Sequence, residues 1–99
     1  MKVNKKQVCD LLNRELGVDK KLVYVDKDSI YDRCYKVKYG LIEVIVFYVL
    51  DDDKTFVDCF IKGEHVARFE VIKEKGEIKL DNGVGRGDYF KKYKTEGIK

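Results

Sequence analysis

The sequence contains no proline and no tryptophan, and it has one histidine and one serine. The absence of proline excludes collagen-like segments and proline-rich linkers. No G-x-S-x-G motif surrounds the single serine, so a serine hydrolase is not expected.

Long apolar stretches are also missing. The longest apolar run, Val44–Leu50, has seven residues, whereas a membrane-spanning helix needs about 20. After Met1 and Lys2 there is no apolar segment of the kind that a secretory signal contains. We therefore expect a cytoplasmic protein that has no contact with a membrane.

The chain has 99 residues, of which 44% are hydrophobic and 39% are charged. This length suits one small domain over residues 1–99, and the hydrophobic content is too high for a disordered chain. The net charge of +3 lies entirely in residues 82–99, because residues 1–81 hold 16 basic and 16 acidic side chains. We expect a basic C-terminal end on an otherwise neutral protein.

The three cysteines, Cys9, Cys34 and Cys59, are far apart in the sequence. A structural zinc site needs four close ligands, and a disulfide scaffold uses an even number of cysteines. We expect three reduced thiols and no metal site. His65 and Cys59 lie on strands that flank one predicted hairpin, so a Cys–His pair there is a catalytic alternative.

One amphipathic helix is predicted over residues 4–16. Asn4 is a suitable N-cap with Gln7 at the capping-box position, and Gly17 can end the helix in the left-handed conformation. The apolar residues with helical spacing are Val8, Leu11, Leu12 and Leu16.

The rest of the chain alternates in polarity or is rich in β-branched residues, which predicts strands. We expect strands at residues 22–25, 30–39, 41–50, 55–62, 65–73 and 77–80. Residues 41–50 are expected to form a central strand in which Ile45 and Phe47 are largely buried. A turn is expected at Gly63 and Glu64, and a short helix at residues 89–94.

These elements predict the α+β fold class. The expected architecture is an N-terminal helix packed on a five- to six-stranded antiparallel meander sheet, curled in one alternative, with a short C-terminal helix. One helix is about 10–12 Å across, whereas five strands make a sheet roughly 24 Å wide. Part of the sheet therefore needs another cover.

Aromatic residues are the candidates for the uncovered part. Either the sheet curls and buries both faces, or an aromatic face stays exposed for a partner protein or a homodimer. Tyr31, Tyr35 and Tyr39 are predicted to share one side of their strand. The partner-binding candidates on the sheet are Tyr31, Tyr35, Phe56 and Phe60.

A second candidate is the C-terminal segment, in which cations alternate with aromatic rings. Its candidate residues are Arg86, Tyr89, Lys91, Lys92, Tyr93 and Lys94. Cations contact phosphates and rings stack on unpaired bases, so this segment could bind nucleic acid. The alternatives are a protein-binding segment and a plain solvated end.

Two further motifs are not expected to hold a ligand. Asp51, Asp52 and Asp53 are contiguous and lack the spacing and the glycine of a calcium loop. The glycines at positions 83, 85 and 87 have neither the Walker nor the dinucleotide-binding spacing. We therefore expect no cofactor.

The amino-acid composition suggests an origin. Residues with AT-rich codons (Phe, Tyr, Met, Ile, Asn, Lys) number 40, against 13 with GC-rich codons (Gly, Ala, Arg, Pro). This indicates an AT-rich genome, such as that of a low-GC bacterium, its phage or a mobile element.

We expect a non-catalytic protein that inhibits or modulates a host protein, for example a defence nuclease, as an anti-CRISPR protein does. The alternative is a nucleic-acid-binding accessory protein that uses the C-terminal segment.

Overall fold

The computed structural model describes residues 1–81. Its elements are the helix α1 (Lys5–Leu16), the 3-10 turn η1 (Lys20–Leu22), and the strands β1 (Tyr24–Val25), β2 (Cys34–Tyr39), β3 (Ile42–Val49), β4 (Lys54–Ile61), β5 (Glu64–Glu74) and β6 (Glu77–Leu80). Each strand pairs antiparallel with the next one in the sequence. The α+β prediction is confirmed, while the helix predicted at residues 89–94 lies outside the described residues.

The capping residues of α1 explain where this helix begins and ends. The Asn4 side chain accepts a hydrogen bond from the Gln7 backbone N–H at 2.8 Å, and the Gln7 side chain accepts one from the Asn4 N–H at 2.8 Å. Gly17 ends the helix with φ of 68°, a value that suits glycine. The predicted helix and both of its caps are confirmed.

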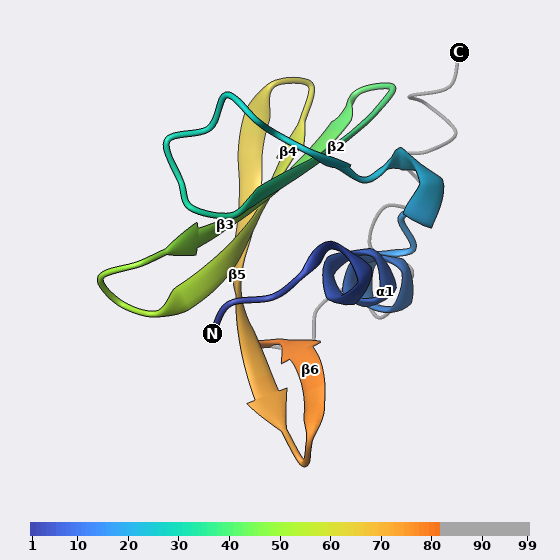
Figure 1. Cartoon of the computed structure of the whole chain (residues 1–99). Coiled ribbons are helices and arrows are strands. Elements are labelled where there is room, and N and C mark those ends of the chain that lie inside the picture. Colours follow the sequence, from blue (N-terminus) through green and yellow to red (C-terminus); the bar gives the residue numbers. More distant parts are fainter. Residues whose placement is uncertain (82–99) are drawn as a thin grey trace.

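The sheet curls around α1 and encloses the hydrophobic core (Figure 1). The α1 residues in this core are Val8, Leu11, Leu12 and Leu16, and the strand residues include Tyr35, Val44, Val46, Val57, Cys59, Phe69 and Val71. We call the side of the sheet that carries these strand residues the inner face, and the opposite side the outer face.

The long strand β5 lets the sheet change direction. Its first part pairs with β4 as far as Glu70, opposite Phe56, and its second part pairs with β6 from Val71, opposite Leu80. The β5–β6 hairpin therefore extends away from the other strands, below α1 in Figure 1. Arg14 of α1 donates a hydrogen bond to the Ile78 carbonyl and so joins the helix to β6.

Strand β3 lies in the middle of the sheet, between β2 and β4, as predicted. Its inner-face residues Val44 and Val46 are at most 1% exposed, and Phe47 on the outer face is buried. Ile45, also on the outer face, is partly buried and is more exposed than these three residues. The reason is that α1 covers the inner face alone.

Two hairpins have two-residue turns in which both central residues have positive φ. The angles are 55° at Lys62 and 81° at Gly63, and 52° at Lys75 and 78° at Gly76. Such turns match the right-handed twist of the flanking strands. The first turn lies one residue earlier than the predicted Gly63–Glu64. A Cβ on Gly63 would meet nothing within 4 Å, so the requirement there is one of backbone conformation.

A β-bulge shifts the register between β4 and β5. Phe60 pairs with His65, but Cys59 pairs with Ala67, so Val66 is an extra residue. Beyond the bulge, Arg68 lies on the outer face. Without the extra residue, alternation from His65 would direct Arg68 inward.

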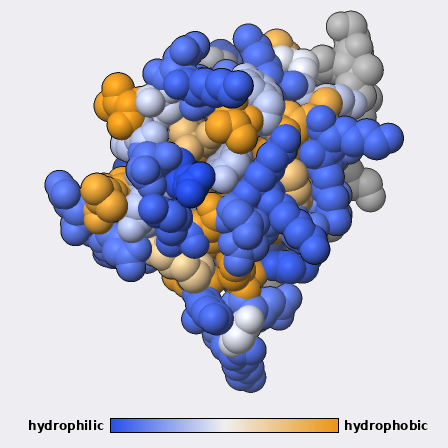
Figure 2. All heavy atoms as spheres, viewed as in Figure 1, coloured by the Kyte–Doolittle hydropathy of each residue, from blue (hydrophilic) through white to orange (hydrophobic). Residues whose placement is uncertain are grey.

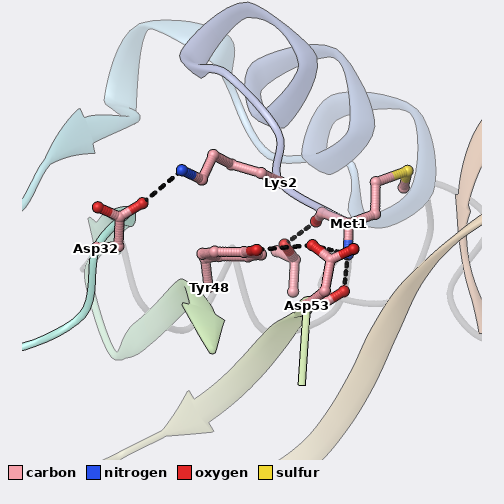
Figure 3. A network of polar contacts seen from close by, with 6 residues as sticks. Met1, Lys2, Asp32, Tyr48 and Asp53 are labelled. Carbon is pink, nitrogen blue, oxygen red and sulfur yellow. Dashed lines mark hydrogen bonds and ion pairs between the residues drawn. The ribbon is translucent and has the colours of Figure 1, made fainter. Parts of the chain in front are cut away.

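A polar network ties Met1 to the turn between β3 and β4 (Figure 3). The Met1 ammonium donates to the Asp53 carbonyl and lies 3.4 Å from its carboxylate, while Thr55 donates to the Met1 carbonyl. The Tyr48 hydroxyl donates to the Asp53 carboxylate at 2.6 Å, which raises the pKa of Tyr48. These contacts fix the segment before α1 over the sheet. Within residues 1–81, no helix has both the length and the apolar character needed to cross a bilayer.

Candidate functional site

The outer face is built from three rows of side chains that cross strands β2 to β5. The rows are Cys34, Phe47, Phe56 and Glu70; Lys36, Ile45, Asp58 and Arg68; and Lys38, Glu43, Phe60 and His65. Whereas the inner face is almost entirely apolar, the outer face combines aromatic rings with charged groups. That combination makes it the candidate functional site.

An aromatic cluster occupies one side of this face. The ring of Tyr31 lies 4.6 Å from that of Phe47, and Phe47 lies 5.7 Å from Phe56, between ring centroids. Phe47 is buried beneath its neighbours, Phe56 is half-buried, and Tyr31 is 41% exposed. A partner would therefore meet Tyr31 and Phe56 first, with Phe47 supporting both.

Arg68 is fixed beside these rings. Its Nε and Nη2 atoms donate to the two carboxylate oxygens of Asp58 at 2.6 and 2.9 Å. Its guanidinium carbon lies 5.5 Å from the ring centroids of Phe47 and Phe56. The hydrogen bonds to Asp58 raise the pKa of Arg68 further, so the guanidinium stays charged. Arg68 is thus held in one orientation by an ion pair and by cation–π contacts.

His65 lies on the other side of Asp58. Its Nε2 atom is 3.4 Å from Asp58 Oδ1, and its ring meets that of Phe60 edge-on at 5.2 Å. Neither of these neighbours is a thiol. Cys59 lies in the inner-face core, where burial raises its pKa to about 12. The Cys59–His65 alternative is therefore wrong, because the two side chains lie on opposite faces.

The rim of the outer face continues beyond Tyr31. Tyr31 also lines a hollow of about 310 Å³ with the exposed residues Ile30 and Leu50. Lys2 forms an ion pair at 2.9 Å with Asp32, which lines the same hollow. On the side of the molecule shown in Figure 2, hydrophobic side chains lie as separate groups among hydrophilic ones.

The structure places three of the predicted partner-binding residues, Tyr31, Phe56 and Phe60, on the outer face. It brings Tyr31 and Phe56 together through Phe47, and it places Phe60 further along β4. Their role in binding stays a prediction.

Tyr35 is different, because it is 4% exposed and belongs to the core. The prediction that Tyr31 and Tyr35 share one side is wrong. Strand β2 begins only at Cys34, so strand alternation does not extend back to Tyr31. The remaining candidates lie outside the described residues: Arg86, Tyr89, Lys91, Lys92, Tyr93 and Lys94.

Sequence reasoning missed Phe47, Asp58, His65 and Arg68 as members of this site. The alternation of polarity along residues 55–62 already placed Asp58 beside Phe56 and Phe60, and that signal could have added Asp58 to the candidates. The position of Arg68 could not be found in this way, because the bulge reverses the alternation of faces along β5.

Within residues 1–81, neither the pocket beside η1 nor any group of metal-ligating side chains suits a ligand as well as the outer face suits a partner. A pocket of about 180 Å³ lies between η1 and strands β2 and β3, and it is lined by Val18, Asp19, Leu22, Val37, Tyr39 and Ile42. It is smaller than the roughly 300 Å³ at which ligand sites begin. Within the described part of the chain, no three His, Cys, Asp or Glu side chains are grouped so that they could hold a metal ion.

No protein-family model, curated protein or solved structure matches this chain. The geometry of the outer face is therefore the basis on which a function can be proposed.

Proposed function

We propose that this chain is a small non-catalytic binding protein that covers a surface of a partner protein with its outer face. One observation carries the proposal: the Tyr31–Phe47–Phe56 cluster lies beside an arginine, Arg68, that Asp58 holds in place. Aromatic residues and arginine dominate the energetics of protein interfaces. Side chains that are already ordered lose little conformational freedom on binding, which favours affinity.

The size of the outer face indicates how a partner would bind. Four strands about 4.8 Å apart and eight residues long make a face of roughly 500 Å². A standard interface needs about 800 Å² from each protein. A stable complex would therefore also use the rim, where Ile30 is 94% and Leu50 66% exposed. The proposed binding surface is the outer face together with this rim.

The proposal takes the partner to be a host protein whose activity the chain inhibits or modulates by occlusion. The excess of amino acids with AT-rich codons, which is typical of an AT-rich genome such as that of a phage or mobile element, favours that kind of partner. A second copy of the chain on the same face is the competing occupant, and the oligomeric state in solution tests it.

Affinity purification from host cells tests the proposal when it is run with matched variants. Tyr31→Ala and Phe60→Ala truncate the proposed surface, while Lys6→Ala truncates an exposed residue of α1. We expect wild type and Lys6→Ala to capture the same protein, and each outer-face variant to bind it about tenfold or more weakly. Thermal unfolding of each variant verifies that it is folded. A partner retained equally by all four proteins would contradict the proposal.

The alternative function is nucleic-acid binding through the C-terminal segment. It is supported by the position of the net charge in residues 82–99. Residues 1–81 offer nucleic acid little, because their basic and acidic side chains are equal in number. Release of the captured material by nuclease would favour this alternative.

A further inference from the structure

We infer that Arg68 binds a carboxylate side chain of the partner protein. This inference rests on the proposed function and adds the chemistry of the partner. The first observation is that the two side chains of the Asp58–Arg68 ion pair differ in how far they are exposed. The Asp58 side chain is 10% exposed, whereas the Arg68 side chain is 55% exposed. The negative charge therefore lies within the surface and the positive charge lies on it.

The guanidinium of Arg68 has N–H groups that Asp58 does not occupy. Asp58 occupies Nε and one position on Nη2, and within residues 1–81 the Arg68 side chain forms no other hydrogen bond. The Nη1 amino group is thus available to an acceptor from outside. A carboxylate matches the planar geometry of a guanidinium edge better than a neutral carbonyl does, and hydrogen bonds between charged groups are the stronger ones.

The surroundings of Arg68 favour one carboxylate over a row of phosphates. Phe47 and Phe56 contact the guanidinium and keep water from part of it, which strengthens an ionic contact. The rows of the outer face hold three cations (Lys36, Lys38 and Arg68) and three carboxylates (Glu43, Asp58 and Glu70), so the face offers a polyanion no net attraction. A single acidic side chain flanked by apolar residues, which would contact Tyr31 and Phe60, needs only the one cation.

A library of random 12-residue peptides displayed on yeast tests this inference without knowledge of the partner. Arg68→Gln removes the cation but leaves Asp58 without its guanidinium, so this variant could fail to fold. Asp58→Asn/Arg68→Gln removes both charges and keeps an amide pair in their place. Peptides that bind wild type but not the double variant are the informative ones. Tyr31→Ala and Phe60→Ala identify the peptides that need the outer face.

We expect the informative peptides to carry Asp or Glu next to apolar residues. Replacing that Glu by Gln should weaken binding to wild type about two- to fivefold. The same replacement should leave binding to Asp58→Asn/Arg68→Gln unchanged. Fluorescence polarisation with labelled peptides measures both affinities.

The other outcomes separate this inference from the proposed function. Peptides that need Tyr31 or Phe60 but no acidic residue would overturn the role of Arg68 and leave the binding face in place. Recovery of no peptide that needs the outer face would contradict both. Stronger binding of a short oligothymidylate, lost with Asp58→Asn/Arg68→Gln, would assign Arg68 to a phosphate and overturn the carboxylate.

Discussion

The two faces of strand β3 differ although their residues alternate along the same eight positions. Val44 and Val46 lie in hydrocarbon on the inner face, at most 1% exposed. Ile45 is half-buried on the outer face, where Asp58 is its neighbour on β4 and Lys36 on β2. The two faces therefore differ in their surroundings: the inner face forms the core, whereas the outer face is less covered and is the one that we propose binds a partner.

The matched pair Ile42→Ala and Ile45→Ala gives the largest expected difference between the faces. Ile42 is 2% exposed in the core, so its truncation should lower the free energy of unfolding by about 2–5 kcal/mol. Ile45 is half-buried, and its truncation should cost about 1 kcal/mol because solvent already reaches part of it. Urea unfolding measures both values. Equal losses would mean that the outer face is as closely packed as the inner one.

The cysteines sharpen the same comparison through their reactivity. Burial on the inner face raises the pKa of Cys59 from 9.0 to about 12, which lowers its thiolate fraction near pH 8 about 1000-fold. Cys9 on α1 is half-buried and should react with iodoacetamide well before Cys59. Mass spectrometry of the labelled protein identifies the order. Rapid labelling of Cys59 in the folded protein would contradict an inner face from which solvent is excluded.

Without reductant, we also expect all three cysteines to be free thiols, which the mass of the intact protein measures.

On the outer face, the ion pair should matter less for stability than the core does. Arg68→Gln leaves the Asp58 carboxylate without its guanidinium and should cost about 1–3 kcal/mol, a loss limited by the exposure of Arg68. Asp58→Asn/Arg68→Gln should recover most of that loss, since no unpaired charge remains. A double-mutant cycle by thermal unfolding measures the coupling. If the double variant were less stable than Arg68→Gln, the cost of an unpaired carboxylate would be refuted.

The smallest expected effect concerns the basic segment outside the described residues. Replacing Lys91, Lys92 and Lys94 by Gln removes three positive charges. If the partner is single-stranded nucleic acid and all three contact phosphates, the log–log salt dependence of affinity should become shallower by about 2. If the partner is a protein on the outer face, the change should mainly slow association. Unchanged binding to every partner would remove this segment as a functional site.

Much of the fold could be predicted from local patterns. Asn4, Gln7 and Gly17 specify the limits of α1, and the apolar character of residues 41–50 specifies the central strand. The turn at Lys62 and Gly63 was predicted one residue too late, because the sequence alone does not show that lysine adopts positive φ there. Capping and strand patterns are local, which is why they can be read without the tertiary structure.

The candidate site could be predicted only in part, and the bulge explains why. With Ile61 opposite Glu64 and no bulge, Asp58 would face Ala67 instead of Arg68. The extra residue Val66 moves Arg68 opposite Asp58 and onto the outer face. A bulge depends on tertiary packing as well as on local sequence, so the ion pair at the centre of the site was not predictable. Tyr35 was misplaced because its pairing with Val46 puts it on the inner face, whereas Tyr31 precedes the start of β2 at Cys34.

Site-specific photo-crosslinking in host cells tests the central claim most directly, because it asks which face a partner touches. Benzoylphenylalanine would replace Phe60 on the outer face in one variant and Lys6 on the exposed side of α1 in the other. We expect a crosslink to a protein at position 60 that is absent at position 6 and is competed by unlabelled wild type. A crosslink at position 6 with none at position 60 would contradict the assignment of the outer face as the binding surface.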